Sequence, residues 1–499
     1  MEFPGIDVMW SGLGLLFQPH VLLWLGVGLC AGFIVGAIPG FNDTNFLAMI
    51  LPFTIYLGAM QAVIFMMACF AGSQAAGSIP AILLNIPGTP SNAPTCLEGF
   101  PLTRRGLAGQ ALGCSFVSSG VGGFLSAILC CTLTPIVGFY ALKFGPAEMF
   151  MAALFGMTAV GSLTGKSVLK GLFSSALGLF AACVGTETEL AYTRGAFGFY
   201  ELYEGFPLIP VLLGLFGFAV LFSLVQEEFL VEKGRHTFTG YGPIIQGMRE
   251  ALRYPGGLIR AGVTGFIIGI IPGTGGAIAT WVSYGQAKQW SKTPEKFGTG
   301  HYEGLVSTDA CNNGVTGGAL IPTLTLGIPG SGTTLVVMAA IMINGIRPGP
   351  TFFAEFGKEA YAILFSLPIS NLLMFVVGVA IAGLLVRVTA IPTRFLVPII
   401  GVFCIAGGFA WREMVFDMSL VVIFGVFGAL LSRYGYSVPA FLLSMLLGPL
   451  AETNFHWAIT IGGINTFFSP IAMFIFLLTI SVLLLPPVLR KMARRGQER

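Results

Sequence analysis

The sequence predicts an all-α, polytopic membrane protein with about 10–14 transmembrane or re-entrant helices, arranged as two repeats that contain broken helical hairpins. Three observations predict this fold: a scarcity of charge, long charge-free runs, and proline-glycine motifs that recur in both halves of the chain. Hydrophobic residues make up 55% of the 499 residues and charged residues 9%, whereas a soluble domain carries about 25% charged residues. This composition excludes an ordinary soluble fold.

Long runs without Asp, Glu, Lys or Arg determine how many helices the chain can hold. These runs cover residues 44–97, 106–142, 310–346 and 453–489. One membrane crossing needs about 20 apolar residues, so several runs must hold two crossings, or one crossing and a re-entrant segment. Apolar segments predict helices near residues 21–38, 45–58, 60–77, 108–141, 147–163, 168–184, 207–225, 257–271, 274–289, 304–320, 360–388, 393–410, 414–431, 437–449 and 465–487. The segment 108–141 is expected either to be continuous or to break near residues 120–123.

Internal similarity predicts the repeats. The stretch GFIVGAIPG recurs as GFIIGIIPG, from residue 32 to residue 265, an offset of 233. The Ile-Pro and Ile-Pro-Gly motifs recur from 80 to 322 and from 87 to 329, an offset of 242. The difference between the offsets matches a charged insertion, WSKTPEKFGTGH, that only the second half contains. Two ordered motif pairs at nearly one offset indicate a duplicated architecture.

The repeats divide the chain into four parts. We expect a first membrane repeat at 1–225, a cytoplasmic loop at 226–256, a second membrane repeat at 257–489 and a basic cytoplasmic tail at 490–499. Basic residues mark cytoplasmic loops. The first repeat follows a segment without them, whereas the second follows Lys233, Arg235, Arg249, Arg253 and Arg260. If the two repeats begin on opposite sides of the membrane, they are inverted. Inversion requires an odd number of membrane crossings between the two starts, and the sequence does not fix this number, so the parallel arrangement stays open.

The recurring proline-glycine motifs are the candidate substrate site. Proline and glycine interrupt helices, and non-helical backbone at membrane depth must be buried in protein or line a wet cavity. A broken helix exposes N–H groups that favour anions, and neighbouring hydroxyls can donate to carboxylates. The candidate substrate-binding residues are Gly40, Asn85, Pro87, Gly88, Thr89, Ser91, Asn92, Gly273, Pro329, Gly330, Ser331, Thr333 and Thr334. The alternative is that these residues only cap and kink packed helices.

Polar residues within apolar segments are the candidates for a coupling ion, because ionisable groups inside a membrane are costly and usually functional. These are Asp43, Asp309, Asn312 and Asn313. Carboxylate and amide oxygens suit Na⁺, and a carboxylate alone can carry H⁺. Asp43 has a second interpretation as the cap of the following helix. Basic residues at helix ends, Arg433 among them, are interpreted as structural.

Enzyme chemistry is not predicted. The sequence contains no GxSxG, HExxH or GxxxxGK[ST] motif, and its four histidines are far apart in the chain. The nine cysteines include no CxxC pair and are interpreted as small buried hydrophobic residues, so no metal other than Na⁺ is expected. A channel remains an alternative, but it should present a pore ring or filter rather than paired proline-glycine breaks.

Motifs along nearly the whole chain carry a family resemblance. They are GFIVGAIPG, GSIPAILLNIPGTPSNAPTCLEGFPLTRRGLAGQAL, FGPAEMF, GFIIGIIPGTGG, HYEGLVSTDACNNGVTGGALIPTLTLGIPGSGTT and NGIRPGP, in this order. The chain resembles the large membrane subunit of the tripartite tricarboxylate transporter family, the TctA type. The resemblance places the substrate region on the proline-glycine motifs and on Asp309, Asn312 and Asn313.

The resemblance also implies an activity and partners. It implies a multi-pass permease of the bacterial inner membrane that imports small carboxylates, of the tricarboxylate or dicarboxylate class, on a gradient of Na⁺ or H⁺. The partners would be a small membrane subunit (TctB type), a periplasmic solute-binding protein (TctC type) and the lipid bilayer. It implies no nucleic acid and no cofactor beyond the coupling ion.

Overall fold

A computed structural model describes residues 6–164, 167–187, 192–225, 240–388 and 393–497. Residues 226–239 of the predicted cytoplasmic loop, and the side chains of the predicted basic tail at 490–499, lie outside the described residues. The described part is helical except for one short hairpin, in which β1 (Gly185–Thr186) pairs antiparallel with β2 (Thr193–Arg194). The prediction of an all-α fold is therefore confirmed at this level.

Eight segments of the described chain are long and apolar enough to cross a membrane. They are Pro19–Gly36, Ala59–Leu84, Ala108–Ala141, Pro146–Leu163, Gly357–Ala380, Phe395–Arg412, Val415–Arg433 and Val438–Phe468. Their number and length identify a multi-pass membrane protein.

The first half of the chain contains eleven α-helices among its described residues. They are α1 (Ile6–Leu16), α2 (Pro19–Gly36), α3 (Asp43–Ile50), α4 (Ala59–Ala76), α5 (Ser78–Leu84), α6 (Ala93–Arg104), α7 (Ala108–Ala141), α8 (Pro146–Thr164), α9 (Val168–Ala182), α10 (Leu208–Leu212) and α11 (Ala219–Leu224). Short 3-10 segments are η1 (Leu51–Tyr56), η2 (Pro90–Asn92) and η3 (Tyr200–Leu202), and η4 (Leu213–Phe218) is a π-helix between α10 and α11.

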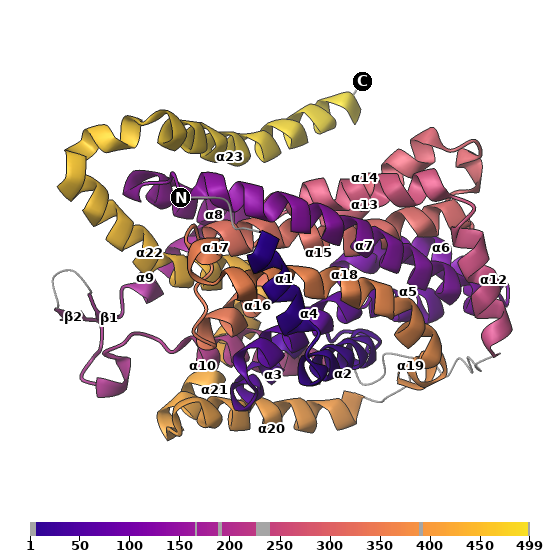
Figure 1. The fold of residues 1–499 in the computed structure, drawn as a ribbon, viewed down its shortest axis with the longest axis horizontal. Helices are drawn as coiled ribbons and strands as arrows, with labels where there is room; N and C mark the ends of the chain where they lie inside the picture. Colours follow the sequence, from indigo (N-terminus) through magenta and orange to yellow (C-terminus); the bar gives the residue numbers. More distant parts are fainter. Residues whose placement is uncertain (1–5, 165–166, 188–191, 226–239, 389–392, 498–499) are drawn as a thin grey trace.

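The second half contains twelve α-helices among its described residues. They are α12 (Tyr241–Ala251), α13 (Pro255–Gly269), α14 (Gly275–Trp290), α15 (Tyr302–Leu326), α16 (Gly332–Ile343), α17 (Phe352–Glu355), α18 (Gly357–Ala380), α19 (Ala382–Val388), α20 (Thr393–Arg412), α21 (Val415–Arg433), α22 (Val438–Gly462) and α23 (Pro470–Gln497). The 3-10 segments are η5 (Pro294–Lys296) and η6 (Gly463–Phe468). Figure 1 shows α15 in the middle of the molecule beside α7, with α20 and α23 at opposite edges.

Glycines allow helices α2 and α4 to pack with their backbones in contact. A Cβ atom on Gly28 would lie 2.4 Å from the carbonyl oxygen of Phe65, and one on Gly32 would lie 2.4 Å from that of Cys69. Helices α13 and α15 pack in the same way, because a Cβ on Gly265 would lie 2.2 Å from the Cys311 carbonyl oxygen. Small residues at such contacts are typical of membrane helices, where dispersion contacts and not water exclusion drive association.

Helix α7 is continuous through residues 120–123, where a break was one expectation. The glycines there serve helix packing instead of a turn. A Cβ on Gly122 would lie 2.1 Å from the Ala310 carbonyl oxygen of α15, and the Ser126 hydroxyl donates a hydrogen bond of 2.5 Å to the Gly314 carbonyl. The two most central helices are thus joined along their glycine-rich faces.

Each proline-glycine motif lies where a helix stops. Between α2 and α3 the chain turns through Gly40, whose φ is 76°, and between α13 and α14 it turns through Gly273, whose φ is 81°. Helix α5 ends at Asn85 in the left-handed conformation, and α15 ends at Gly327 in the same conformation. The predicted helix breaks are therefore present in the structure.

A buried carboxylate, that of Glu98 on α6, binds the loop between α14 and α15. It accepts hydrogen bonds from the backbone N–H groups of Gly298 (2.6 Å), Gly300 (2.8 Å) and His301 (2.7 Å). It also accepts one from the Tyr284 hydroxyl (2.8 Å), and the Glu98 side chain is fully buried. This loop is the charged insertion of the second half, so Glu98 fixes it onto the first half.

Candidate functional site

A cavity of about 1100 Å³ lies where the four helix breaks meet. Its polar wall consists of residues 42–45, 89–91, 273–278 and 331–333, one segment from each break. Most of its other lining residues are apolar and come from η4, α11, α21 and the start of α22. The structure therefore brings together in space motifs from both halves of the sequence, between Asn42 and Thr333.

Three helices begin at this cavity: α3 at Asp43, α14 at Gly275 and α16 at Gly332. The first N–H groups of an α-helix have no acceptor within that helix and carry a partial positive charge. Ser331 caps α16, because its hydroxyl accepts a hydrogen bond of 3.2 Å from the Thr334 N–H. A cavity with this wall favours anionic ligands.

The carboxylate of Asp43 is the one acidic group among the described residues that line the cavity. Its Oδ2 accepts hydrogen bonds from the Gln74 amide (2.8 Å) and the Thr333 hydroxyl (2.9 Å), and the residue is 4% exposed. The cap of α3 is Asn42, whose side chain accepts from the Asn45 N–H at 2.9 Å. The interpretation of Asp43 as the helix cap is therefore wrong, and its carboxylate faces polar partners at the cavity.

Asp309 lies on α15, is fully buried and does not line the cavity. Its Oδ1 accepts hydrogen bonds from the hydroxyls of Ser78 (2.9 Å) and Thr95 (2.7 Å), which belong to α5 and α6. Its Oδ2 is buried without a hydrogen-bond partner among the described residues. A buried carboxylate with one unpaired oxygen is suited to bind a cation or a proton.

The two asparagines beside Asp309 point to different neighbours. The Asn312 amide donates a hydrogen bond of 2.9 Å to the backbone carbonyl of Gln74, near Asp43. The Asn313 amide approaches Asn371 and Met374 of α18, each at 3.5 Å. The side-chain oxygens of both asparagines have no hydrogen-bond partner among the described residues. The structure thus does not gather the predicted ion ligands into one shell.

The predicted substrate-binding residues separate into two groups. Those that line the cavity are Thr89, Ser91, Gly273, Ser331 and Thr333. Those that do not are Gly40, Asn85, Pro87, Gly88, Asn92, Pro329, Gly330 and Thr334. Several of the second group hold the breaks in place through the backbone: the Gly88 N–H donates to the Gly77 carbonyl (3.1 Å) and the Gly273 N–H to the Gly330 carbonyl (2.9 Å).

Several residues that line the cavity are not among the predicted site residues. Asn42, Thr44, Asn45, Gln74, Gly275 and Gly276 also face the cavity, and all except Gln74 directly follow a predicted break. Arg433 is the one basic residue among the described lining residues. It ends α21, and nothing near it in the sequence indicates a site, because only the tertiary fold brings it to the breaks. The π-helix η4 also contributes to the wall, and such segments are frequent at functional sites.

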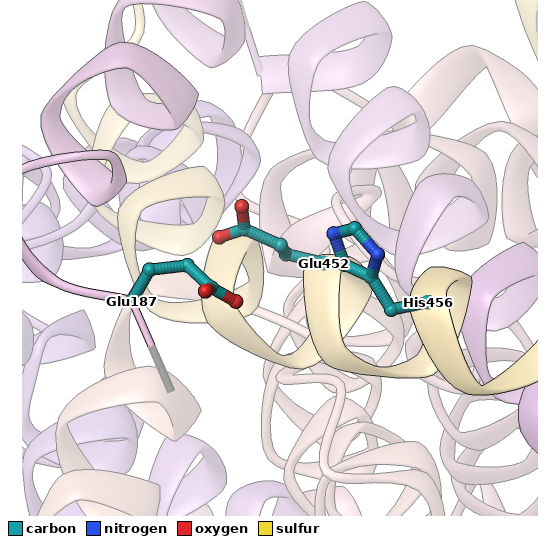
Figure 2. Close-up of side chains that lie close together, drawn as sticks. All are labelled: Glu187, Glu452 and His456. Carbon is teal, nitrogen blue, oxygen red and sulfur yellow. The ribbon is translucent and has the colours of Figure 1, made fainter. Parts of the chain in front are cut away.

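A second group of polar residues lies away from the cavity. Figure 2 shows Glu452 and His456 on α22 with the Glu187 carboxylate beside them, and their potential ligand atoms lie within 4.8 Å of one another. The Arg194 guanidinium donates to both carboxylate oxygens of Glu452. These hydrogen bonds raise the pKa of Arg194 above its ordinary value. Arg194 thus already compensates the Glu452 charge and fastens the β-hairpin to α22.

Comparisons with known proteins give one consistent result. A model of the family described as "Tripartite tricarboxylate transporter TctA family" matches residues 22–443 of the chain. These residues include all four helix breaks and all of the described residues that line the cavity.

Two proteins of Agrobacterium vitis are similar to this chain. An uncharacterized 52.8 kDa protein in the TAR-I ttuC' 3' region is 34% identical over 456 residues, which cover 91% of this chain and 90% of that protein. An uncharacterized protein in the TAR-II ttuC' 3' region is 33% identical over 198 residues, which cover 40% of this chain and 82% of that protein. No solved structure matches the chain.

Proposed function

The chain belongs to the tripartite tricarboxylate transporter TctA family, and from this membership and the cavity we propose that it imports small tricarboxylates or dicarboxylates by secondary active transport coupled to a cation gradient. As a component of a transporter family it is not an enzyme, in agreement with the prediction from its motifs.

The convergence of four helix breaks on one cavity is the observation that carries this proposal. Carboxylates are small, flat anions that accept several hydrogen bonds at once. The N-termini of α3, α14 and α16 supply N–H donors and partial positive charge, and Thr89, Ser91 and Ser331 supply hydroxyls. Broken helices at the interface of two repeats recur in secondary transporters for this reason.

The proposed architecture has two inverted repeats at 1–225 and 257–489, with re-entrant hairpins at the proline-glycine breaks. Glycine-mediated packing of α2 on α4 and of α13 on α15 uses corresponding motif positions, which supports a duplication. Contacts also cross between the halves: the hydroxyls of Thr44 and Thr333 are 2.8 Å apart, and a Cβ on Gly276 would lie 2.8 Å from the Ser91 Cβ. Movement of one half against the other would therefore open and close the cavity.

We propose that the coupling cation is Na⁺ or H⁺ and that Asp43 and Asp309 bind it at two separate positions, with Asn312 and Asn313 as neutral groups beside Asp309. Asp43 faces the cavity, where an ionised carboxylate would repel an anionic substrate. Binding of a cation at this carboxylate removes the repulsion, which gives a physical reason for transport of both together. Asp309 lies behind the cavity and is connected to it through hydrogen bonds, as described below.

The proposed partners follow from the tripartite family: a small membrane subunit (TctB type) and a periplasmic binding protein (TctC type) that delivers the carboxylate. The proposed location is the bacterial inner membrane, with the loop 226–256 and the tail 490–499 in the cytoplasm. Cysteine labelling that placed residues 2–10 and 235–253 on the same side would contradict the inverted arrangement.

Uptake of radiolabelled citrate by proteoliposomes tests the proposal. The chain is reconstituted with its small membrane subunit, and purified binding protein is supplied outside. We expect uptake only with the binding protein and with an inward gradient of Na⁺ or of protons. Uptake that needs neither a gradient nor the binding protein would overturn the proposal.

A matched pair of variants tests the cavity. Thr333→Val removes a hydroxyl from the lining, whereas Thr325→Val removes one that bonds only to the Ile321 carbonyl of its own helix. Both sites are buried threonines of the second half. We expect the first variant to lower citrate uptake about tenfold and the second to leave it near the wild-type rate. Equal rates for the two variants would argue against this cavity as the substrate site.

A further inference from the structure

A continuous chain of hydrogen-bonded side chains connects Asp309 to the cavity. The Ser78 hydroxyl donates to Asp309 (2.9 Å), and the Asn92 amide donates to the Ser78 oxygen (2.9 Å). The Thr89 hydroxyl donates to the Asn92 carbonyl oxygen (2.6 Å), and the Ser91 and Thr89 hydroxyls are 2.7 Å apart. All five residues are buried, and Thr89 and Ser91 line the cavity.

The direction of every bond in this chain is determined. A carboxylate only accepts hydrogen bonds, and an amide has one donating end and one accepting end. Ser78 therefore gives its single proton to Asp309, and Thr89 gives its single proton to Asn92. Because the Thr89 proton is already used, Ser91 must be the donor in its contact with Thr89.

The direction of these hydrogen bonds determines whether the Thr89 and Ser91 hydroxyls can donate to an anion in the cavity. While Asp309 is ionised, the protons of Thr89 and Ser91 point along the chain toward it. Both hydroxyls then present only oxygen lone pairs to the cavity. Lone pairs repel the carboxylate of a substrate, so the wall at η2 is unsuited to an anion in this state.

We propose that Asn92 and Ser78 form a relay through which a cation at Asp309 turns the Thr89 and Ser91 hydroxyls into donors for the substrate carboxylate. This inference rests on the proposed function and assigns to Asn92 a positioning role behind the cavity instead of substrate contact. A cation at Asp309 attracts the Ser78 oxygen and repels its proton. The Ser78 proton then turns to Asn92, whose amide must rotate to accept it.

Rotation of the Asn92 amide reverses the rest of the chain. Its NH₂ group then donates to the Thr89 oxygen, which frees the Thr89 proton and, in turn, the Ser91 proton for the cavity. The space beside the amide comes from Gly77, where α4 meets α5, because a Cβ there would lie 2.4 Å from the Asn92 side-chain oxygen. Linkage requires the reverse effect as well: a bound carboxylate strengthens cation binding at Asp309 to the same degree.

The surroundings of Asp309 make the relay its main polar connection to the cavity. Among the described residues, no Lys or Arg forms an ion pair with Asp309. Among the described residues, the thiols of Cys96 and Cys114 lie near enough to interact electrostatically with Asp309, and the hydroxyls of Ser115 and Thr308 lie beside it as well. Thr95 donates to the same Asp309 oxygen as Ser78, and the hydrogen bonds of its hydroxyl among the described residues go to Asp309 and Thr308, not to Asn92 or Thr89. Thr95 therefore provides a control that lies outside the relay.

The test measures citrate affinity against cation concentration in the membrane complex, purified in nanodiscs. Affinity of ¹⁴C-citrate is measured in Na⁺ and in choline at constant ionic strength, and at about pH 6 and pH 8. We expect the wild type to bind at least about tenfold more tightly with the coupling cation. Ser78→Ala and Asn92→Leu should each reduce this factor to less than about twofold, whereas Thr95→Val should retain it.

Ser78→Ala and Asn92→Leu interrupt different hydrogen bonds of the relay, so both should reduce the cation dependence of citrate affinity. The double variant should show no further loss of coupling, since one interruption already separates Asp309 from the cavity. If one variant does not fold, as judged by size exclusion and thermal unfolding, the other alone decides the outcome.

The results also separate the relay from the proposed function. If the citrate affinity of the wild type changes neither with Na⁺ nor with the proton concentration, cation coupling is overturned, and the relay with it. The relay alone is overturned if the coupling cation raises citrate affinity in the wild type and raises it by the same factor in Ser78→Ala or Asn92→Leu. Loss of coupling in Thr95→Val to the same extent would show that any perturbation of Asp309 suffices, which also rejects the relay.

Discussion

The Thr333 hydroxyl donates a hydrogen bond of 2.9 Å to the carboxylate of Asp43, from a position 290 residues away in the chain. This bond joins the N-terminus of α16 to that of α3, so the acidic group of the cavity is held by both halves of the protein. A change at either residue should therefore be visible in substrate binding and not only in stability.

Asp43→Asn should weaken the dependence of substrate affinity on the coupling cation. The amide retains a hydrogen-bond acceptor for Thr333 but removes the negative charge that faces the anion. We expect citrate affinity at low cation concentration to rise about tenfold, while uptake driven by the gradient falls. Equilibrium binding and proteoliposome uptake measure the two effects. An unchanged cation dependence would exclude Asp43 from coupling.

Arg433→Gln should weaken the capture of anionic substrates. Arg433 is exposed at the cavity wall, where its charge attracts carboxylates over a distance set by ionic strength. We expect KM for citrate to rise about three- to tenfold at low salt, with kcat nearly constant, and the difference to shrink in high salt. Arg387→Gln serves as the control, since Arg387 is also exposed but does not line the cavity. An equal rise of KM in both variants would remove Arg433 from substrate capture.

Glu98→Ala should destabilise the contact between the two halves. Three backbone N–H groups of the loop lose their acceptor, and because Gly298 is exposed and Gly300 and His301 are half-buried, each lost hydrogen bond should cost about 1 kcal/mol. Tyr284→Phe removes only one of the bonds to Glu98 and should cost about 1 kcal/mol. Thermal unfolding in nanodiscs and limited proteolysis of residues 291–301 measure both. Similar unfolding temperatures for the two variants would contradict the central role of Glu98.

Gly28→Ala should separate α2 from α4 and lower stability by about 1–3 kcal/mol, because the new Cβ would lie 2.4 Å from a backbone oxygen that cannot rotate away. Gly26→Ala, on the same helix, places its Cβ in open space and should be neutral or slightly stabilising. Thermal unfolding of the two variants gives the comparison. A loss of stability in Gly26→Ala as large as in Gly28→Ala would show that close packing against α4 is not the reason why Gly28→Ala is costly.

The sequence predicts the fold class and the helix breaks because both depend on local composition. Charge-free runs fix the membrane class, and proline with glycine fixes where helices stop. It is less informative about side-chain direction. Thr334 and Asn92 lie within predicted motifs, yet Thr334 accepts a hydrogen bond from the Ser331 N–H in the capping box of α16, and Asn92 bonds to Ser78 behind the cavity. A non-helical break has no regular periodicity, so its sequence does not indicate which side chains face the cavity.

Contacts between distant elements could not be predicted either. Arg433 reaches the cavity only because α21 packs beside η4, and no motif surrounds it. The glycines at 120–123 had two interpretations, and the choice between a break and close packing depended on whether a partner helix lay against them. Helix α15 is that partner.

Helix α7 has 34 residues and no charge along its length, so at 1.5 Å per residue it is about 51 Å long. The hydrocarbon layer is about 30 Å thick, and tilts above about 40° are rare. Lipid alone therefore cannot surround it. Each end contacts another helix: Gly113 lies against the Ile244 backbone of α12, and Gly138 against the Phe353 ring of α17. The position of α7 should consequently depend little on bilayer thickness, which makes it a fixed reference against which other helices move.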